Sequence, residues 1–463
     1  MEEDQHTTPR SSRIGQRIIL LPLPAQGHLT PIFQLAYTLH NQGFKITIVH
    51  PQTLSPDQSN YPHFTFKSIY DGFSDIHKYM PKKPSTSFFV TYLNNNCMDS
   101  FRDCLAELLA EPNEPPVACL ITDAEYYFAQ DVANSLKVHR LVFWACNIVS
   151  VLVYRDLPSF YDKGCFNLTV KDSEFETRVP KYPILKIKDI VKITTNPKCS
   201  AELQRNIAKQ IKASSGIIWN SFIQPEEAIL ENLKQDFGIP VFTLGPLQMY
   251  HPGFTSNQLL EEDRTFFSWL DAQKPKSVIY ASFGSFAKVS KSEFQQVAHG
   301  LANIGFPFLW VVRPGVVEGS EWLEWLPEKF LEEVAGKGHI VKWCPQNEVL
   351  AHPAIGCFWT HSGWNSTLES VCKGVPMICS PCNVGQPIIA RYVSDVWKIG
   401  VLLEDGLERM GIERAIKRVM LDKEGEEMRR RISRLKEEVT ISFDEGGSSH
   451  TSLKSLIGHI LSL

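Results

Sequence analysis

The segment Trp343–Gln386 has the sequence WCPQNEVLAHPAIGCFWTHSGWNSTLESVCKGVPMICSPCNVGQ. Its pattern predicts, in order, the end of one strand, a buried strand over Gly356–Thr360, a turn that contains glycine, and a helix with a polar start over Asn365–Cys372. The backbone N–H groups at such a helix start form a natural diphosphate site. The segment can therefore hold a planar base, a ribose and a diphosphate at once.

Three side chains of this segment are candidates for contacts with the base and the ribose. The indole of Trp343 stands at a strand end, where it can stack on a flat base, although a tryptophan of this kind is often part of a core. Gln346 and Glu369 can hydrogen-bond vicinal hydroxyls such as those of a ribose, although a glutamate on a helix is most often solvated. Each signal is weak when it is taken alone.

The turn after the buried strand supplies candidates for the diphosphate. Gly363 permits a tight turn, and His361, Asn365 and Ser366 offer side-chain donors at the start of the helix. The simpler alternative is that the serine and the asparagine only cap the helix. Ser285 follows another strand in a glycine-containing loop, which gives a second and weaker candidate for an anion site.

Composition narrows the class of molecule. The 463 residues are too many for one ordinary core, so two domains are expected. The net charge of −4 gives no bulk attraction to nucleic acid or to an anionic membrane. The N-terminus has no apolar run typical of a signal peptide, and no later run approaches the ~20 apolar residues of a membrane span. We expect a cytoplasmic monomer without a nucleic-acid partner.

Eleven cysteines are scattered along the chain without the spacing of a disulfide framework. An odd number, with many in apolar strand-like runs, favours reduced thiols in a cytosolic protein. Cys379 and Cys382 form a C-x-x-C pair, but neither a second pair nor suitably spaced histidines accompany it. Buried thiols are therefore favoured over a zinc site, and no metal site is predicted.

Strands and helices alternate along the chain, which predicts an α/β fold. The first half opens with a strand over Arg17–Leu23, a loop over Pro24–Thr30, an amphipathic helix and a second strand, and these form a βαβ unit with a parallel sheet. The alternation starts again at Ser277–Phe283. Two open Rossmann-like sheets place a ligand cleft at the C-terminal ends of their strands. We expect an N-terminal domain, a linker and a C-terminal domain over residues 1–245, 246–262 and 263–463.

His28 and Asp123 each follow a predicted strand of the first domain. A histidine in the loop P-A-Q-G-H can act as a general base, because its unperturbed pKa is about 6.5. Asp123 ends the apolar run CLITD, where its carboxylate can bond one imidazole nitrogen and fix the tautomer. The alternatives are an ordinary loop histidine and an aspartate that caps the following helix.

The 44 residues Trp343–Gln386 resemble, in sequence and in length, the donor-binding signature of plant family 1 UDP-sugar-dependent glycosyltransferases. The resemblance covers essentially the whole chain and is closest to the subgroup that includes steviol-glycoside and cytokinin glucosyltransferases. It implies the GT-B fold of two facing Rossmann-like domains, with the last helix packing back on the first domain. It also implies an inverting transfer in which His28 deprotonates the acceptor, Asp123 orients His28, and no metal or cofactor is needed beside the UDP-sugar.

The resemblance further implies a set of donor contacts. Trp343 stacks on uracil, Gln346 and Glu369 hold the ribose, and Trp364 and Gln386 meet the sugar. The diphosphate is bound by Ser285, His361, Asn365 and Ser366. The complete set of expected donor-binding residues is Ser285, Trp343, Cys344, Gln346, His361, Gly363, Trp364, Asn365, Ser366, Glu369, Gly385 and Gln386.

The chain departs from the family signature at two positions near the sugar. Family members usually have Asp or Glu, which binds sugar hydroxyls, where this chain has Gly385, and a Thr or Ser where it has Ala145, although Asn147 could serve instead. The loss of a charged hydrogen bond costs on the order of 1.5–3 kcal/mol. Three hypotheses follow: glucose remains the donor sugar, another UDP-sugar such as a pentose donor replaces it, or the protein binds a UDP-sugar or metabolite without turnover.

Aromatic residues of the first domain are candidates for the acceptor site beside His28. They are, together with Ala145, Phe88, Phe89, Tyr92, Tyr126, Tyr127 and Trp144. Aromatic walls suit apolar aglycones such as flavonoids, terpenoids or other phenols, although ordinary core packing is the alternative for each. The expected reaction is the transfer of glucose from UDP-glucose to a hydroxyl of a small apolar plant metabolite.

Overall fold

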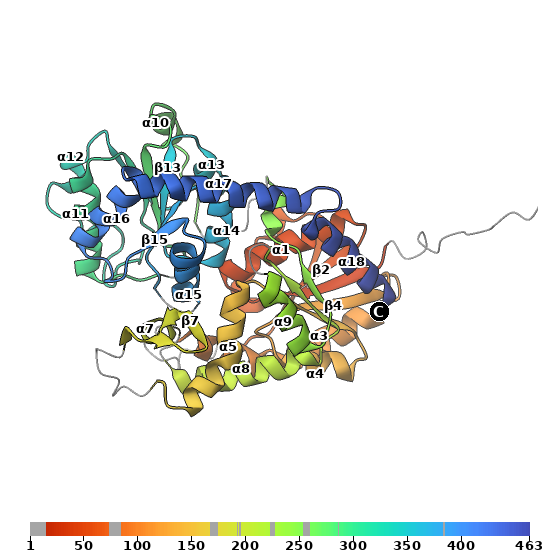
Figure 1. The fold of residues 1–463 in the computed structure, drawn as a ribbon. Coiled ribbons are helices and arrows are strands. Elements are labelled where there is room, and N and C mark those ends of the chain that lie inside the picture. Colours follow the sequence, from red (N-terminus) through yellow and green to blue (C-terminus); the bar gives the residue numbers. More distant parts are fainter. Residues whose placement is uncertain are drawn as a thin grey trace, which may run out of the picture. The chain divides into compact units, whose positions relative to one another are not determined.

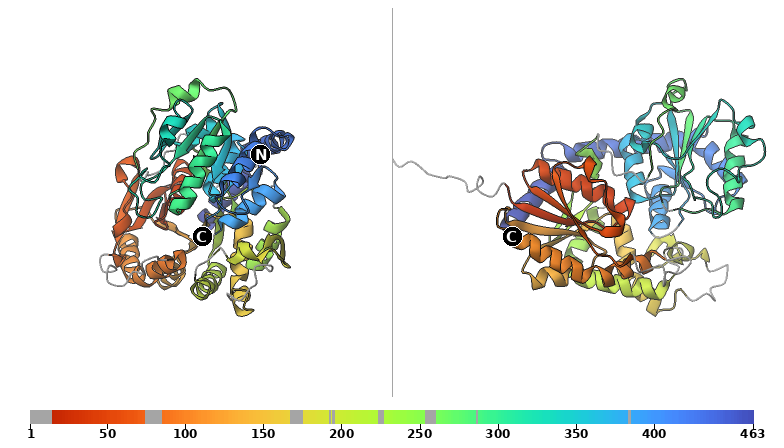
Figure 2. Two further views of the ribbon diagram at one scale, coloured as in Figure 1. Left: turned by 90° about the vertical axis from the view of Figure 1, so that its left-hand side faces the viewer. Right: turned by 180° about the vertical axis from the view of Figure 1, so that it is seen from behind.

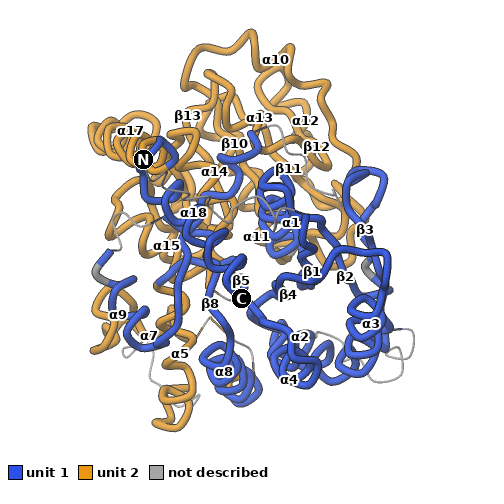
Figure 3. The backbone as a smooth tube through the Cα atoms, turned by 90° about the vertical axis from the view of Figure 1, so that its right-hand side faces the viewer, with its two compact units in different colours: residues 1–148, 198–257, 443–463 blue, residues 149–197, 258–442 orange. Residues whose placement is uncertain are grey.

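The computed structural model describes residues 15–73, 85–166, 175–191, 193, 196–222, 227–252, 260–285, 287–382 and 385–463. By its contacts the chain groups into two compact units, which Figure 3 colours separately. Unit 1 comprises residues 1–148, 198–257 and 443–463, and unit 2 comprises residues 149–197 and 258–442. Residues 149–197, which we expected in the N-terminal domain, thus group with unit 2. Part of the expected linker, residues 253–259, lies outside the described residues.

Unit 1 is built on a parallel sheet with the strand order β3-β2-β1-β4-β5-β8-β9. The order of the strands along the chain reverses between β1 and β4, and α/β proteins bind ligands at such a switch point. Leu21 of β1 pairs with Thr122 of β4, so the residues that follow these two strands lie side by side. The strands are β1 (Arg17–Leu21), β2 (Lys45–Pro51), β3 (Phe64–Ile69), β4 (Val117–Asp123), β5 (Arg140–Trp144), β8 (Gly216–Trp219) and β9 (Val241–Thr243).

Helices lie on both faces of this sheet (Figures 1 and 2). The last helix packs against β4 and β9, and its Leu453, Leu456 and Ile460 join the apolar core that the sheet forms with the first helix. The helices associated with this sheet are α1 (Gln26–Asn41), α2 (Thr86–Asn96), α3 (Met98–Ala110), α4 (Phe128–Ser135), α8 (Pro197–Lys212), α9 (Glu227–Phe237) and α18 (Ser448–Ser462).

Helix α1 begins at Gln26, so the predicted loop over Pro24–Thr30 is wrong and His28 lies in the first turn of a helix. The N-cap residue is Ala25, whose side chain cannot cap a helix, and the sequence therefore carries no start signal at this point. The N–H of His28 donates to the carbonyl of Ala25 at 2.8 Å. This helical hydrogen bond fixes the backbone from which the imidazole projects.

Unit 2 is built on a second parallel sheet, with the strand order β12-β11-β10-β13-β14-β15, and carries a short antiparallel pair, β6 and β7. The strands of the sheet are β10 (Val278–Ser282), β11 (Phe308–Val311), β12 (Gly338–Val341), β13 (Ile355–Thr360), β14 (Met377–Cys379) and β15 (Gly400–Leu402), and the pair is β6 (Arg178–Val179) and β7 (Tyr182–Lys186). The two parallel α/β sheets confirm the predicted fold class.

Helices also lie on both faces of the sheet of unit 2 (Figure 1). They include α11 (Lys291–Ile304), α13 (Gln346–Ala351), α14 (Trp364–Lys373), α15 (Gln386–Arg391), α16 (Arg409–Met420) and α17 (Lys423–Phe443), and the segment before the sheet adds α5 (Ile148–Asp162) and α7 (Ile187–Val191). All eleven cysteines of the chain are described, and each is a free thiol. Within the described residues, none of the helices has both the length and the hydropathy needed to cross a membrane.

Candidate active site

The C-terminal ends of β1 and β4 bring His28 and Asp123 together. Nδ1 of His28 lies 2.7 Å from Oδ2 of Asp123, and Oδ1 of Asp123 accepts the N–H of Glu125 at 3.0 Å. The Asp123 side chain is only 2% exposed, whereas that of His28 is 29% exposed. In the neutral imidazole this contact keeps the proton on Nδ1, which leaves Nε2 as a proton acceptor.

The charges around His28 set its protonation. Burial lowers the pKa of His28, but the charge and hydrogen bond of Asp123, together with the charge of Glu125, outweigh burial and raise that pKa to about 9. Because the ring is 29% exposed, solvent screens part of these interactions, and the contact with Asp123 decides the upward direction. Burial also raises the pKa of the Glu125 carboxyl. Sequence reasoning missed Glu125, because no motif around it marks it as a neighbour of His28.

Three of the aromatic residues expected to bind the acceptor lie on α2 and form a half-buried cluster. Phe88, Phe89 and Tyr92 are all partly exposed. Phe73, which the sequence analysis did not single out, joins them with ring centroids 5.6 Å from Phe89 and 5.3 Å from Tyr92. The Tyr92 hydroxyl donates to the carbonyl of Gly72 at 2.7 Å, which anchors the cluster to the end of β3.

The other expected aromatic residues are packed more deeply. Tyr126 is fully buried, and Trp144 stacks on the buried Trp219 with centroids 5.6 Å apart. Tyr127 is half-buried, and Ala145 is buried at the end of β5. Tyr126 therefore lies in the core of unit 1, and only part of the expected aromatic wall has exposed surface.

In unit 2, Gln346, Ser366 and Glu369 form one hydrogen-bonded group. Nε2 of Gln346 donates to Oγ of Ser366 at 2.9 Å and to a carboxylate oxygen of Glu369. Its Oε1 accepts the hydroxyl of Tyr280 at 3.1 Å, so β10 holds the glutamine side chain in place. Burial raises the pKa of Glu369 to about 7. The pair predicted to hold a ribose is thus assembled, with Tyr280 as a support that the sequence did not reveal.

His361 lies between two glycines. A Cβ on Gly284 would be 2.5 Å from Cε1 of His361, and a Cβ on Gly363 would be 2.5 Å from its Nε2, so only glycine leaves room for the ring. Burial and the charge of Arg313 lower the pKa of His361 to about 4, which keeps the imidazole neutral at pH 7. Arg313, also missed from the sequence, donates from Nε to the carbonyl of Gly284 at 3.2 Å.

The start of α14 has the features of an anion site. Its N-cap residue is Gly363, so no side chain caps the backbone N–H groups of the first turn, where Asn365 lies. Ser362 before it has a φ of +63°, a strained conformation for an L-residue and one often found at functional sites. Trp364, expected near the sugar, is buried with its ring centroid 6.2 Å from that of Trp397.

The remaining donor candidates lie at the ends of strands or at a helix start. Trp343 is half-buried just after β12, and the neighbouring Cys344 is buried. Ser285 lies, half-buried, in the turn after β10. Gln386 is the first residue of α15, and its Oε1 accepts the N–H of Cys382 at 2.9 Å.

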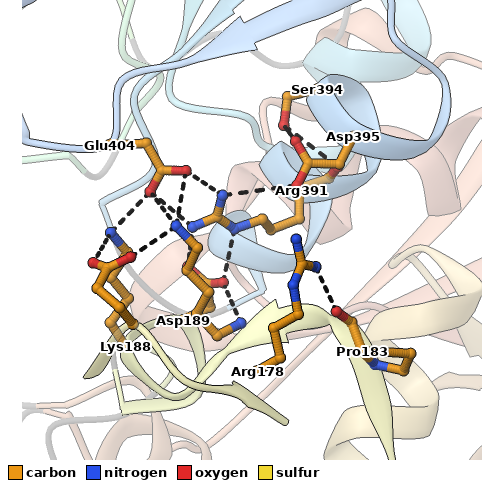
Figure 4. A network of polar contacts seen from close by, with 10 residues as sticks. Arg178, Pro183, Lys188, Asp189, Arg391, Ser394, Asp395 and Glu404 are labelled. Atoms are coloured by element: carbon orange, nitrogen blue, oxygen red, sulfur yellow. Dashed lines mark hydrogen bonds and ion pairs between the residues drawn. The ribbon is translucent and has the colours of Figure 1, made fainter. Parts of the chain in front are cut away.

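Helix α15 is anchored at its far end by a buried ion network (Figure 4). Arg391 is 2% exposed, and its Nε donates to Oδ2 of Asp189 at 2.8 Å. Its Nη2 donates to Oε2 of Glu404 at 2.9 Å, and Lys188 pairs with the same Oε2 at 2.8 Å. Asp189 belongs to α7, so this network ties the segment 149–197 to the helix that Gln386 begins.

Comparison with known proteins identifies relatives along the full length of the chain. Residues 228–442 match the family described as UDP-glucoronosyl and UDP-glucosyl transferase. UDP-glycosyltransferase 76G1 of Stevia rebaudiana is 47% identical, with 100% of both chains covered. Flavonol 3-O-glucosyltransferase UGT76E12 of Arabidopsis thaliana is 41% identical over 96% of this chain and 97% of its own length. The structure of Os79 from O. sativa in complex with UDP superposes with a TM-score of 0.78 and 26% identity, over 96% of this chain and 100% of that one.

The two parallel sheets and the likeness to Os79 define a transferase of the GT-B fold. Identity of 47% to a relative over its entire length shows the family more narrowly. The chain belongs to the plant family 1 UDP-glycosyltransferases. The predicted family, fold and enzyme class are therefore confirmed. The substrates of the enzyme are a UDP-sugar and a small plant metabolite.

Proposed function

We propose that the enzyme transfers glucose from UDP-glucose, with inversion, to a hydroxyl of a small apolar plant metabolite such as a flavonoid or terpenoid. The observation that carries this proposal is the 2.7 Å contact between Nδ1 of His28 and Oδ2 of Asp123 at the switch point of the unit 1 sheet. A histidine held in this way by a buried carboxylate is a general base with a fixed tautomer.

In the proposed reaction Nε2 of His28 removes the proton of the acceptor hydroxyl. The resulting oxygen attacks the anomeric carbon, the bond from that carbon to the diphosphate oxygen breaks, and UDP leaves from the opposite face. The imidazolium that forms is stabilised by Asp123, whose carboxylate is already oriented by the N–H of Glu125. The products are the β-glucoside, if the donor has the α configuration, and UDP.

The donor is proposed to lie along one edge of the unit 2 sheet. Trp343 stacks on uracil, and the bonded group of Gln346 and Glu369 holds the ribose. The uncapped start of α14, with the neutral His361 and with Ser285, Asn365 and Ser366, receives the diphosphate. Backbone dipoles and neutral donors of this kind stabilise the departing diphosphate, so we propose that the UDP-sugar is the only co-substrate and that turnover needs no added metal.

Acceptor binding is proposed to use the half-buried aromatic cluster of Phe88, Phe89 and Tyr92 near the end of β3. Such a surface suits a flat or bulky apolar aglycone. The free thiols of all eleven cysteines support a reducing, cytoplasmic location as part of the proposal.

Gly385 and Ala145 favour a second candidate, the same reaction with another UDP-sugar such as a pentose donor, because both residues lack a polar side chain. A protein that binds a UDP-sugar without turnover is the alternative of another class, and the intact His28–Asp123 pair argues against it.

The direct test is incubation of the purified protein with a promiscuous phenolic acceptor and a panel of UDP-sugars, with the products read by mass. We expect a hexose increment from UDP-glucose, and a pentose increment with little from glucose would establish the second candidate. His28→Ala should abolish transfer and leave UDP binding intact, and unchanged turnover would remove His28 from its proposed role. UDP binding by the wild type with no product from any donor, over several acceptors, would support the binding protein.

A further inference from the structure

Gly385 has no backbone reason to be a glycine. It precedes α15 with a φ of −76° and a ψ of −7°, values that any L-residue adopts. Gly374, at the end of α14, is different, because its φ of +76° is the left-handed conformation that favours glycine. The missing side chain at position 385 therefore calls for an explanation outside the backbone.

The space that a side chain at position 385 would need is occupied by α5. A Cβ on Gly385 would lie 2.8 Å from the hydroxyl oxygen of Tyr154 and 3.2 Å from Oγ of Ser150. Both distances are shorter than the ~3.5–4.0 Å at which non-bonded atoms pack. Ser150 and Tyr154 are four residues apart, so they share the face of α5 that meets the start of α15.

Both helices are tied by polar contacts to other elements of unit 2. The Tyr182 hydroxyl donates to Oδ2 of Asp156 at 2.6 Å and so ties α5 to β7, while the ion network around Arg391 ties α15 to α7. Tyr154 is half-buried, and its ring has only two rotatable bonds. Its hydroxyl can be displaced from position 385 only by a rotation of the whole ring.

We propose that Tyr154 is a donor-sugar contact residue of this enzyme, and that its hydroxyl stands in for the absent side chain of residue 385 beside Gln386. The inference rests on the proposed function, in which Gln386 meets the sugar. A phenol hydroxyl donates as well as accepts a hydrogen bond, so it suits a sugar hydroxyl in either orientation. Being neutral, it binds that hydroxyl less strongly than a carboxylate. The sugar hydroxyl at this position is thus bound by a neutral group where a carboxylate would be charged.

The first test removes only the hydroxyl. Tyr154→Phe should lower kcat/KM for UDP-glucose about 3–10-fold, the range of one neutral hydrogen bond, and leave the Kd of UDP unchanged. The matched control is Tyr182→Phe, which removes a hydroxyl that ties down the same helix without facing Gly385. We expect the control to lower Tm and to leave the ratio of UDP-glucose to UDP affinity as in the wild type. If the control lost affinity for UDP-glucose relative to UDP as much as Tyr154→Phe does, the proposal would be overturned. Unchanged kinetics of Tyr154→Phe would overturn it as well.

The second test asks whether the two positions share one space. Gly385→Ala adds a single methyl group, and it should lower Tm and kcat/KM in the wild-type background much more than in the Tyr154→Phe background. Gly385→Asp should be poorly active alone and should recover activity when combined with Tyr154→Phe. Equal costs in both backgrounds would show that Tyr154 does not occupy the space of the side chain. If the wild type bound no UDP, the proposed function would fail. The Tm values of the single and double variants would still show whether a side chain at position 385 and Tyr154 compete for one space.

Discussion

The imidazole of His361 and the α-carbon of Gly363 lie so close that a Cβ on the glycine would be 2.5 Å from Nε2 of the ring. The glycine at this turn is therefore required by the neighbouring ring and not by the backbone, since its φ of −63° is open to any residue. In the proposed diphosphate site the neutral ring and the uncapped start of α14 act together, so a change that displaces the ring should also weaken binding at the start of the helix.

Gly363→Ala should displace His361 from the start of α14. We expect a loss of stability of about 1–3 kcal/mol, as for other overpacked sites, and a fall in UDP affinity of at least ~10-fold. Calorimetry with UDP and thermal unfolding measure the two effects. Gly458→Ala in α18 is the matched control, because nothing lies within 4 Å of the added Cβ and alanine favours a helix. A UDP affinity that survives Gly363→Ala unchanged would separate His361 from the diphosphate.

Asp123→Asn should shift the pH profile of transfer to lower pH. Asp123 raises the pKa of His28, and only the neutral imidazole accepts a proton, so kcat/KM of the wild type should rise with pH from above 6.5 to about 9. Without the carboxylate the rise moves towards or below pH 6.5 and the plateau falls, by ~10³–10⁴-fold if the tautomer is lost as in other triads. Asp131→Asn removes an exposed carboxylate of unit 1 and should leave the profile in place. A rise at the same pH in Asp123→Asn would exclude this coupling.

Glu369 should couple UDP binding to pH. Burial raises the pKa of Glu369 to about 7 in the free protein, and a ribose with two hydroxyl donors favours the ionised carboxylate. UDP binding should therefore release protons below pH 7 and tighten as the pH rises through 7. Calorimetry in buffers of different ionisation enthalpy counts the protons. Glu369→Gln should remove the proton release and weaken UDP binding about 10–100-fold, whereas Glu348→Gln, at an exposed position on α13, should do neither. Proton release that persists in Glu369→Gln would assign it to another group.

Arg391→Met should destabilise unit 2 by about 3–5 kcal/mol, because it leaves Asp189 buried without its cation. Arg418→Met breaks a comparable arginine–glutamate contact at the surface and should cost at most ~1 kcal/mol. Chemical denaturation measures both values. Equal losses in the two variants would show that burial of the network does not matter.

The same network should make the free energy of unfolding depend on pH in the acidic range. Although burial opposes it, hydrogen bonding to Arg391 and Lys188 lowers the pKa of Glu404 to about 2. A lowered folded-state pKa contributes stability above the ordinary value of 4.5, and that stability is lost as the pH falls from 4.5 towards 2. Glu404→Gln should flatten the unfolding free energy over this range, and a slope equal to that of the wild type would contradict the assignment.

Much of the architecture follows from patterns that are local in the sequence. The βαβ alternation predicts parallel strands, and parallel strands bring His28 and Asp123 to one sheet edge although 95 residues separate them. The start of α1 was missed because Ala25 gives no capping signal. Tyr280, Arg313 and Tyr154 were missed for another reason: each acts through a contact with a distant residue, and nothing in its own neighbourhood marks it.

The meaning of Gly385 shows this limit most clearly. From the sequence it is a missing carboxylate, and its consequence for the donor sugar stays open. The structure adds that the hydroxyl of Tyr154, 231 positions earlier in the numbering, occupies the vacated space. The link between Gly385 and Tyr154 can be recognised only when the start of α15 and helix α5 are seen in contact.

The association of residues 149–197 with unit 2 has a practical bearing on chimaeric enzymes. A crossover in the connecting stretch 246–262 would take α15 from one parent and α5 and α7 from the other, which would separate Gly385 from Tyr154 and Arg391 from Asp189. To exchange donor preference between two relatives, a chimaera should therefore take both segments, 149–197 and 258–442, from the same parent.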